Sequence, residues 1–153
     1  MSLNKILLII VIAIIIIAGI VVFLASSSVL KDSAEVKFGD DTFALEIADS
    51  DKERQIGLSE KKSLGEKKGM IFLFPESTIP AFWMKGMDFP IDIIFVNGSK
   101  VVSIFKDVPA PKNETDPLPN YQPSSPIDRV IEVPAGTVDK YDIKEGDEIT
   151  ISL

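Results

Sequence analysis

The apolar positions near the N-terminus form one unbroken run. From Ile6 to Leu24 every residue is Ile, Leu, Val, Ala, Phe or a single Gly. As a helix, this run would span roughly 28 Å, close to the ~30 Å hydrocarbon core of a bilayer. Lys5 precedes it, so residues 1–5 should remain cytoplasmic while the rest of the chain is exported. The pattern predicts a single-pass signal anchor, a linker over residues 25–34 and an extracytoplasmic domain over residues 35–153.

A cleaved signal peptide is the alternative for this run, because the small residues Ala25 to Ser28 follow it directly. The apolar region of a signal peptide is usually about 7–15 residues long, and the run here is longer. No clean Ala-x-Ala cleavage site follows it. Cleavage would yield a secreted domain, so the domain is expected outside the cytoplasm in either case.

Beyond the linker, the apolar pattern is mostly that of β-strands. Residues Thr42 to Ala48 alternate between apolar and polar, which indicates a half-buried strand, and the turn at Gly39 to Asp41 connects it back to Val36–Phe38. Continuous apolar runs indicate strands that are covered on both faces, and these occur at Met70–Phe74 and Ile91–Val96. Three further strands are expected at Lys100–Lys106, Arg129–Val133 and Glu148–Leu153.

Two short helices complete the expected fold. Ser50 and Glu53 form a capping-box pattern at the start of the first helix, and Gly57 is expected to end it. A second helical turn is expected around Val138 and Tyr141. The elements together predict a β-rich α+β fold, a small barrel-like or sandwich β domain with two short helices.

One irregular segment, from Val108 to Pro126, contains six prolines and cannot form a central strand or helix. A loop of this length in a compact domain is either disordered or functional. It carries Tyr121, a candidate ligand-binding side chain. It also contains one of two glycosylation sequons, at Asn113. The other sequon, at Asn97, lies in a tight turn, and an Asn-Gly turn by itself explains the Asn at this position.

Composition narrows the possible chemistry. The chain has no Cys and no His, which excludes disulfides, a Ser-His-Asp triad and the usual zinc sites. The net charge is −7, and it becomes −8 without Lys5, which argues against a nucleic-acid partner. No cofactor or metal is expected. A calcium site made of carboxylates alone stays open, but no ligand spacing such as that of an EF-hand loop is present.

The most distinctive stretch runs from Phe82 to Asp92 and contains the only Trp. In an extended segment, Trp83 and Lys85 point to the same side and could form an aromatic and cationic platform for a ligand. The alternative places Trp83 in the core and leaves Lys85 as an ordinary surface charge.

Three charged residues on apolar strands are the other candidates. Asp92 shares a strand face with apolar residues, so it must be paired, hydrogen-bonded or raised in pKa, as a functional acid or a structural ion pair would be. Arg129 and Glu132 lie on opposite faces of one strand and cannot pair with each other. One of them must find a partner elsewhere, and the candidate pairs are Glu132 with Lys85 or Asp92 with Arg129.

Five short segments of the exported part form a recognisable set. They are Ala48-Asp49 with Glu53-Arg54 and Gly57-Leu58, then Gly69 to Phe72, Phe82 to Lys85, Pro90 to Phe95, and Glu132 to Gly136. In this order they resemble the DUF192 (UPF0127) family of small prokaryotic proteins, many of them exported. The resemblance covers nearly the whole domain from about Val36 onward.

This resemblance implies a compact β-rich fold and no established activity. It adds weight to four residues as one cluster without assigning them roles: Trp83, Lys85, Asp92 and Glu132. Many members carry Asn-Thr after the Trp-Met-Lys segment, where this chain has Gly86-Met87. The resemblance therefore implies no polar side-chain role at these two positions.

The leading functional hypothesis is a membrane-anchored module that binds a cell-envelope component, either a glycan or a peptide. Its partners are the lipid bilayer, through Ile6–Leu24, and a ligand held near Trp83 and the Pro-rich segment.

One alternative is a hydrolase that uses Asp92 and Glu132 as general acid and base. Another is an accessory domain of a second membrane protein. The lack of His and Cys favours binding over catalysis. The candidate binding residues are Trp83, Lys85, Asp92, Tyr121, Arg129 and Glu132.

Overall fold

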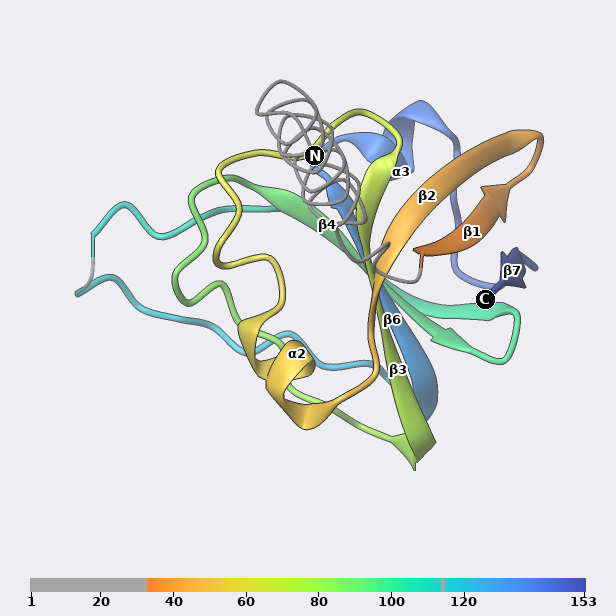
Figure 1. Cartoon of the computed structure of the whole chain (residues 1–153), viewed down its shortest axis with the longest axis horizontal. Coiled ribbons are helices and arrows are strands. Elements are labelled where there is room, and N and C mark those ends of the chain that lie inside the picture. The colour runs from red at the N-terminus through yellow and green to blue at the C-terminus, as the bar shows by residue number, and fades with distance from the viewer. Residues whose placement is uncertain (1–32, 114) are drawn as a thin grey trace, which may run out of the picture. The chain divides into compact units, whose positions relative to one another are not determined.

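The computed structural model describes residues 33–113 and 115–153. Within them, seven strands form one sheet in the order β5-β4-β6-β3-β2-β1-β7, which curls into a half-barrel (Figure 1). Two short helices accompany the sheet, so the expected β-rich fold is confirmed. The expected membrane span, residues 6–24, lies outside the described residues. No helix in the described part is long and apolar enough to cross a membrane.

The elements lie close to where the apolar pattern places them. The strands are β1 Ser33–Phe38, β2 Asp41–Ala48, β3 Lys68–Thr78, β4 Ile91–Asn97, β5 Lys100–Val108, β6 Ile127–Pro134 and β7 Thr150–Ser152. The helices are α2 Asp51–Ile56 and α3 Thr137–Lys140. Strand β1 begins at Ser33, two residues before the expected start of the domain, and pairs with β2 from its first residue.

Helix α2 connects two neighbouring parallel strands, β2 and β3. It begins with the expected capping box: the Ser50 hydroxyl accepts from the Glu53 N–H at 3.3 Å, and the Glu53 carboxylate accepts from the Ser50 N–H at 3.2 Å. The Ser50 hydroxyl also donates to the Glu53 carboxylate at 2.8 Å, and this hydrogen bond, together with that from the Ser50 N–H, lowers the pKa of Glu53 to about 2. Gly57 ends the helix, and the chain then turns back toward the sheet.

The sheet carries an apolar cluster on each face, which explains the continuous apolar runs. On β4, Ile94 belongs to the cluster that packs against α3, whereas Ile93 belongs to the cluster on the opposite face. Strand β6 alternates in the same way between Ile131 and Val130. The central strands β4 and β6 are therefore buried on both faces, as their sequences predict.

Candidate functional site

The segment from Phe82 to Lys85 alternates as an extended chain should. The Phe82 ring packs edge-on against Phe72 and Phe95, with centroids 5.0 and 5.8 Å apart, and Met84 is only 2% exposed. Trp83 points away from this core and is 53% exposed. Trp83 is therefore a surface residue, and the alternative that placed it in the core is wrong.

Lys85 forms the expected platform with Trp83. Its Nζ lies 5.5 Å from the centroid of the indole ring, within the range of a cation–π contact. Within the part of the chain that the structure describes, no carboxylate pairs with Lys85, although eight other cations there form salt bridges. The ammonium group therefore remains available to a ligand.

The platform borders a small pocket, which we call the Glu132 pocket. Residues 54–59 form one wall, Trp83, Lys85 and Met87 form another, and Phe72 and Glu132 from the sheet complete it. Its volume is about 40 Å³. Because a water molecule needs a cavity of roughly 10–15 Å³, the pocket has room for one small polar group and not for a ring.

Two glycines allow the walls of the Glu132 pocket to approach each other. Gly57 has φ +52°, and a Cβ there would lie 3.3 Å from the Phe72 ring. Gly86 has φ +73°, and a Cβ there would lie 3.3 Å from the Cβ of Ser59. The sequence around Gly57 indicates a helix end but not a pocket wall, because no local pattern shows which loop will face residues 57–59.

Glu132 lies in the middle of the sheet. It is opposite Met70 of β3 and Ile93 of β4, and it is only 5% exposed. Among the described residues, no hydrogen bond or ion pair reaches its side chain, so the expected pair with Lys85 is not formed. In this part of the chain, Arg129 Nε is the one fully enclosed side-chain nitrogen or oxygen that lacks a hydrogen-bond partner. The oxygens of Glu132 also lack partners there, so they are not fully enclosed. The carboxyl instead lines the pocket.

Burial controls the protonation of Glu132. Removal of the carboxyl from water raises its pKa from 4.5 to about 8, and neither Arg54 nor Lys85 contributes to the shift. At neutral pH this side chain is therefore mainly a neutral acid that can donate a hydrogen bond. A buried polar group without a partner costs free energy, so its retention in a central strand points to a functional reason.

Asp92 serves a different purpose on the opposite face of the sheet. It is fully buried, and its carboxylate accepts hydrogen bonds from three backbone N–H groups: Asp107 at 2.8 Å, Val138 at 2.8 Å and Gly136 at 3.3 Å. It thereby ties the end of β5 to the start of α3. Asp92 is neither exposed to a pocket nor part of an ion pair, so its role in this fold is structural.

Arg129 does not pair with Asp92 as the sequence analysis expected. Its guanidinium donates to the Asp128 carboxylate at 2.8 Å and to the Gly98 carbonyl at 2.7 Å. Arg129 therefore fastens the turn between β4 and β5 to β6, away from the Glu132 pocket.

The two carboxylates proposed as an acid–base pair face opposite sides of the sheet. In the pairing of β4 with β6, Asp92 is opposite Val133 and Glu132 is opposite Ile93. Neighbouring positions along a strand point to opposite faces, so the sheet itself separates the two side chains. They cannot act on the two sides of one scissile bond.

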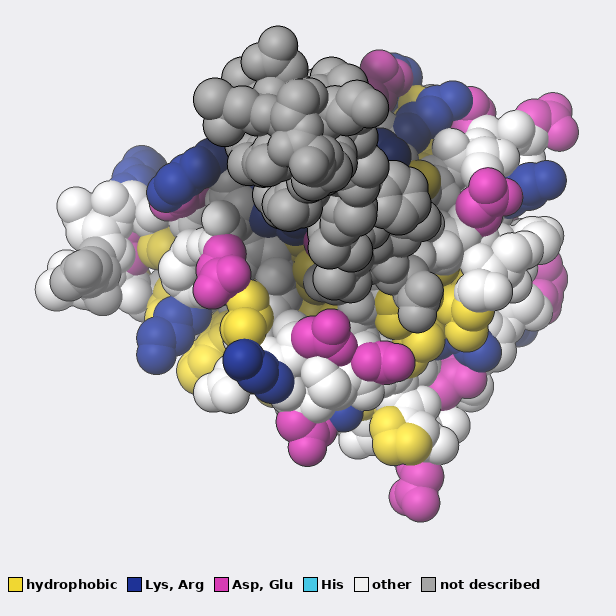
Figure 2. Space-filling view, viewed as in Figure 1, with side chains coloured by type: hydrophobic (Ala, Val, Ile, Leu, Met, Phe, Trp, Pro, Cys, Tyr) yellow, Lys and Arg dark blue, Asp and Glu magenta, His cyan; other side chains and the backbone are white. Residues whose placement is uncertain are grey.

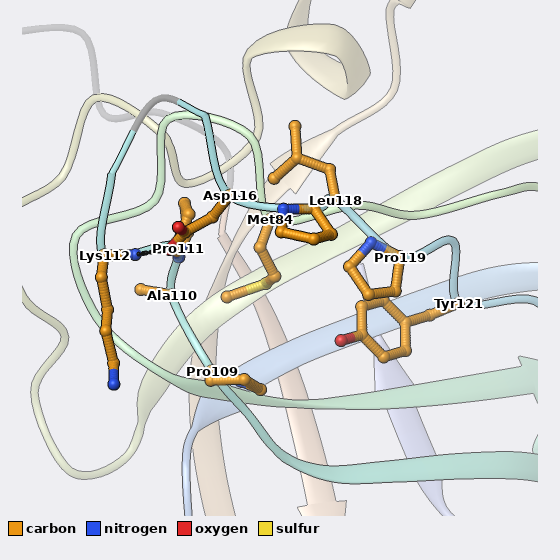
Figure 3. Close-up of a pocket in the computed structure, with 10 residues that line it drawn as sticks. Met84, Pro109, Ala110, Pro111, Lys112, Asp116, Leu118, Pro119 and Tyr121 are labelled. Atoms are coloured by element: carbon orange, nitrogen blue, oxygen red, sulfur yellow. Dashed lines mark hydrogen bonds between the residues drawn. The ribbon is translucent and has the colours of Figure 1, made fainter.

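The Pro-rich segment forms a second hollow, the Pro-rich groove, with a volume of about 450 Å³. Met84 lies between the two arms of the loop, and Tyr121 and Pro119 close one side (Figure 3). Residues Phe82 and Tyr121 form an isolated antiparallel bridge, with backbone N–H···O distances of 2.9 and 2.8 Å. The loop is thus pinned to the segment that carries Trp83.

Charge on the surface is mixed in sign. Acidic and basic side chains are interspersed over the face shown in Figure 2. Among residues 33–113 and 115–153, no group of three or more acidic side chains is arranged to hold a metal ion. On the described surface, Trp83 combines an exposed aromatic ring with a neighbouring cation, Lys85, and a pocket at its edge.

Two solved structures are similar in fold to this chain. A crystal structure of a protein of unknown function from Novosphingobium aromaticivorans is 30% identical, with a TM-score of 0.66 over 77% of this chain and 83% of that one. A proposed transcription regulator from Sinorhizobium meliloti is 23% identical, with a TM-score of 0.65 over 77% and 91%, and supports the fold alone. No curated protein matches. The model of DUF192, a family described as uncharacterised, matches residues 34–151. The chain therefore belongs to the DUF192 family.

Proposed function

We propose that the protein is a membrane-anchored binding module that holds a component of the cell envelope at the Glu132 pocket and the Trp83 platform. The observation that carries this proposal is Glu132, a buried carboxyl without a partner that lines a pocket beside a half-exposed Trp. Residues 6–24 supply the anchor, and the charge bias around them places the domain outside the cytoplasm.

Both features cost free energy in the protein without a ligand. An exposed Trp loses the burial energy that an aromatic side chain normally contributes, and an unpaired buried carboxyl adds a desolvation penalty. Neither feature stabilises the domain. A ligand that covers the indole and supplies a partner to Glu132 would recover both losses.

The Pro-rich groove favours peptides over glycans among envelope components. Its lining consists mostly of apolar side chains, including Met84, Leu118 and several prolines. An apolar side chain of a peptide fits such a lining, whereas a sugar needs polar partners for its hydroxyl groups. Met84 lines the Pro-rich groove, whereas its neighbours Trp83 and Lys85 line the Glu132 pocket, so the two hollows flank one extended segment.

Truncation of Trp83 tests the proposal. The full-length chain, purified in a mild detergent, would be screened against envelope peptides and glycan fragments by thermal shift, with the single Trp as a fluorescent reporter. For any ligand found, Trp83→Ala should weaken binding by roughly 30-fold, as loss of an aromatic anchor does. Because Trp83 is half exposed, the melting temperature of the free protein should hardly change.

Ile79→Ala is the matched control, because Ile79 is 50% exposed and lines neither hollow. It should leave the affinity unchanged. Equal affinity of the Trp83→Ala variant and the unchanged protein for every ligand found would contradict the proposal.

A further inference from the structure

The Glu132 pocket contains two cationic side chains and one carboxyl that is mainly neutral at neutral pH. The Arg54 guanidinium is already engaged, since it donates to the Leu73 carbonyl at 2.7 Å and to the Asp51 carboxylate at 2.6 Å. Lys85 has no such partner in the described part of the chain. The uncompensated charge in the pocket is therefore positive and complements an anion.

The size of the pocket limits what can enter. With a volume of about 40 Å³, it admits one functional group, and the rest of the ligand must lie outside, against Trp83. A carboxylate fits these limits, because it is planar, small and able to accept from two donors at once. A sugar ring brings neighbouring hydroxyl groups that would each need a partner of their own.

Building on the binding function proposed above, we propose that the Glu132 pocket receives the C-terminal carboxylate of a peptide. The Lys85 ammonium supplies the opposite charge. The protonated Glu132 carboxyl donates a hydrogen bond to the carboxylate, and the Trp83 ring covers the residue that precedes it. Charge-assisted hydrogen bonds of this kind are roughly twice as strong as neutral ones.

The same geometry predicts how affinity depends on pH. The groups that face Glu132 from the adjacent strands are apolar, Met70 and Ile93. From the remaining walls, the charged groups are Arg54 and Lys85. Above a pH of about 8 the Glu132 carboxyl ionises, loses its proton donor and repels a second carboxylate. Affinity for an acid should therefore fall as the pH rises, whereas affinity for an amine should rise.

The test uses small probes on the full-length chain in detergent, with Trp83 fluorescence and calorimetry as readouts. Acetyl-dialanine supplies the carboxylate, acetyl-dialanine amide is its neutral match, glucuronic acid is an acidic sugar, and butylamine is a cation. We expect acetyl-dialanine to bind about tenfold or more tightly than its amide. Its affinity should fall by about tenfold per pH unit above a pH of about 8.

Three variants separate the contributions. Glu132→Gln keeps a hydrogen-bond donor that cannot ionise. This variant should bind acetyl-dialanine at neutral pH, and its affinity should not fall at high pH. Lys85→Met should weaken binding by about tenfold or more at neutral pH. Lys52→Met removes an exposed cation from α2 and should change nothing.

Several results would overturn the carboxylate proposal: equal binding of acid and amide, tighter binding of glucuronic acid than of acetyl-dialanine, or tighter binding of butylamine than of acetyl-dialanine at neutral pH. In each of these cases, loss of binding in Trp83→Ala would still support the proposed binding function. If no probe binds at about 10 mM, the carboxylate proposal is wrong. If, in addition, no envelope component binds in a Trp83-dependent way, the binding function fails as well.

Discussion

Asp92→Ala is expected to lower the free energy of unfolding by roughly 4 kcal/mol, since each buried donor left without a partner costs about 1–3 kcal/mol. Three backbone N–H groups lose their acceptor at once, those of Asp107, Gly136 and Val138. Two of these residues also have positive φ, at +50° for Asp107 and +81° for Gly136. The carboxylate therefore holds Asp107 in a left-handed conformation that a non-glycine residue rarely adopts, and it fixes the turn at Gly136 beside it.

Urea unfolding of the full-length chain, followed by circular dichroism, measures this loss. Asp139→Ala is the control on the neighbouring helix, because Asp139 forms an exposed pair with Lys106 that should contribute less than about 1 kcal/mol. Asp92→Asn should fall between the two, since its amide offers one acceptor oxygen in place of two. A cost for Asp92→Ala as small as that for Asp139→Ala would contradict the structural role of Asp92.

Glu132→Gln is expected to stabilise the protein, and increasingly so as the pH rises. The folded-state pKa of Glu132 is about 8, above the ordinary value of 4.5. Between these values the folded chain binds one proton more than the unfolded chain, so its free energy of unfolding falls with rising pH. Over the whole window the loss is on the order of 5 kcal/mol, and the Gln variant does not experience it.

The measurement is the difference in unfolding free energy between Glu132→Gln and the unchanged protein, taken at several values from about pH 5 to about pH 9. Other titrating groups contribute equally to both proteins and cancel. Glu76→Gln, at an exposed carboxyl on β3, provides the control for the substitution itself. A difference for Glu132→Gln that does not change with pH would show that burial does not raise the pKa of Glu132.

The sequence predicts the fold well wherever local chemistry decides it. The apolar runs at Ile91–Val96 and Met70–Phe74 locate β4 and β3, and Ser50 with Glu53 locates the start of α2. The strand order is beyond such reasoning, because long-range pairing depends on the whole chain. Nothing local indicates that β6 inserts between β3 and β4.

For the candidate site, strand periodicity alone correctly assigns faces but not partners. It places Trp83 on the same side as Lys85, and it places Glu132 and Arg129 on opposite faces of their strand. The structure agrees with both assignments. It fails for Asp92, whose partners are backbone N–H groups brought from distant turns. Apolar surroundings predict that a buried carboxyl needs a partner, and only the tertiary structure shows which one it has.

The protonation of Glu132 with and without a ligand directly tests whether its carboxyl forms a binding site. The full-length chain, labelled with ¹³C at glutamate carboxyl carbons, would be titrated by NMR with and without acetyl-dialanine, and Glu132→Gln identifies the resonance. We expect a pKa near 8 in the free protein and a higher one with the ligand bound, because the ligand binds only the protonated acid. A pKa near 4.5 that does not move with the ligand would contradict a binding site at Glu132.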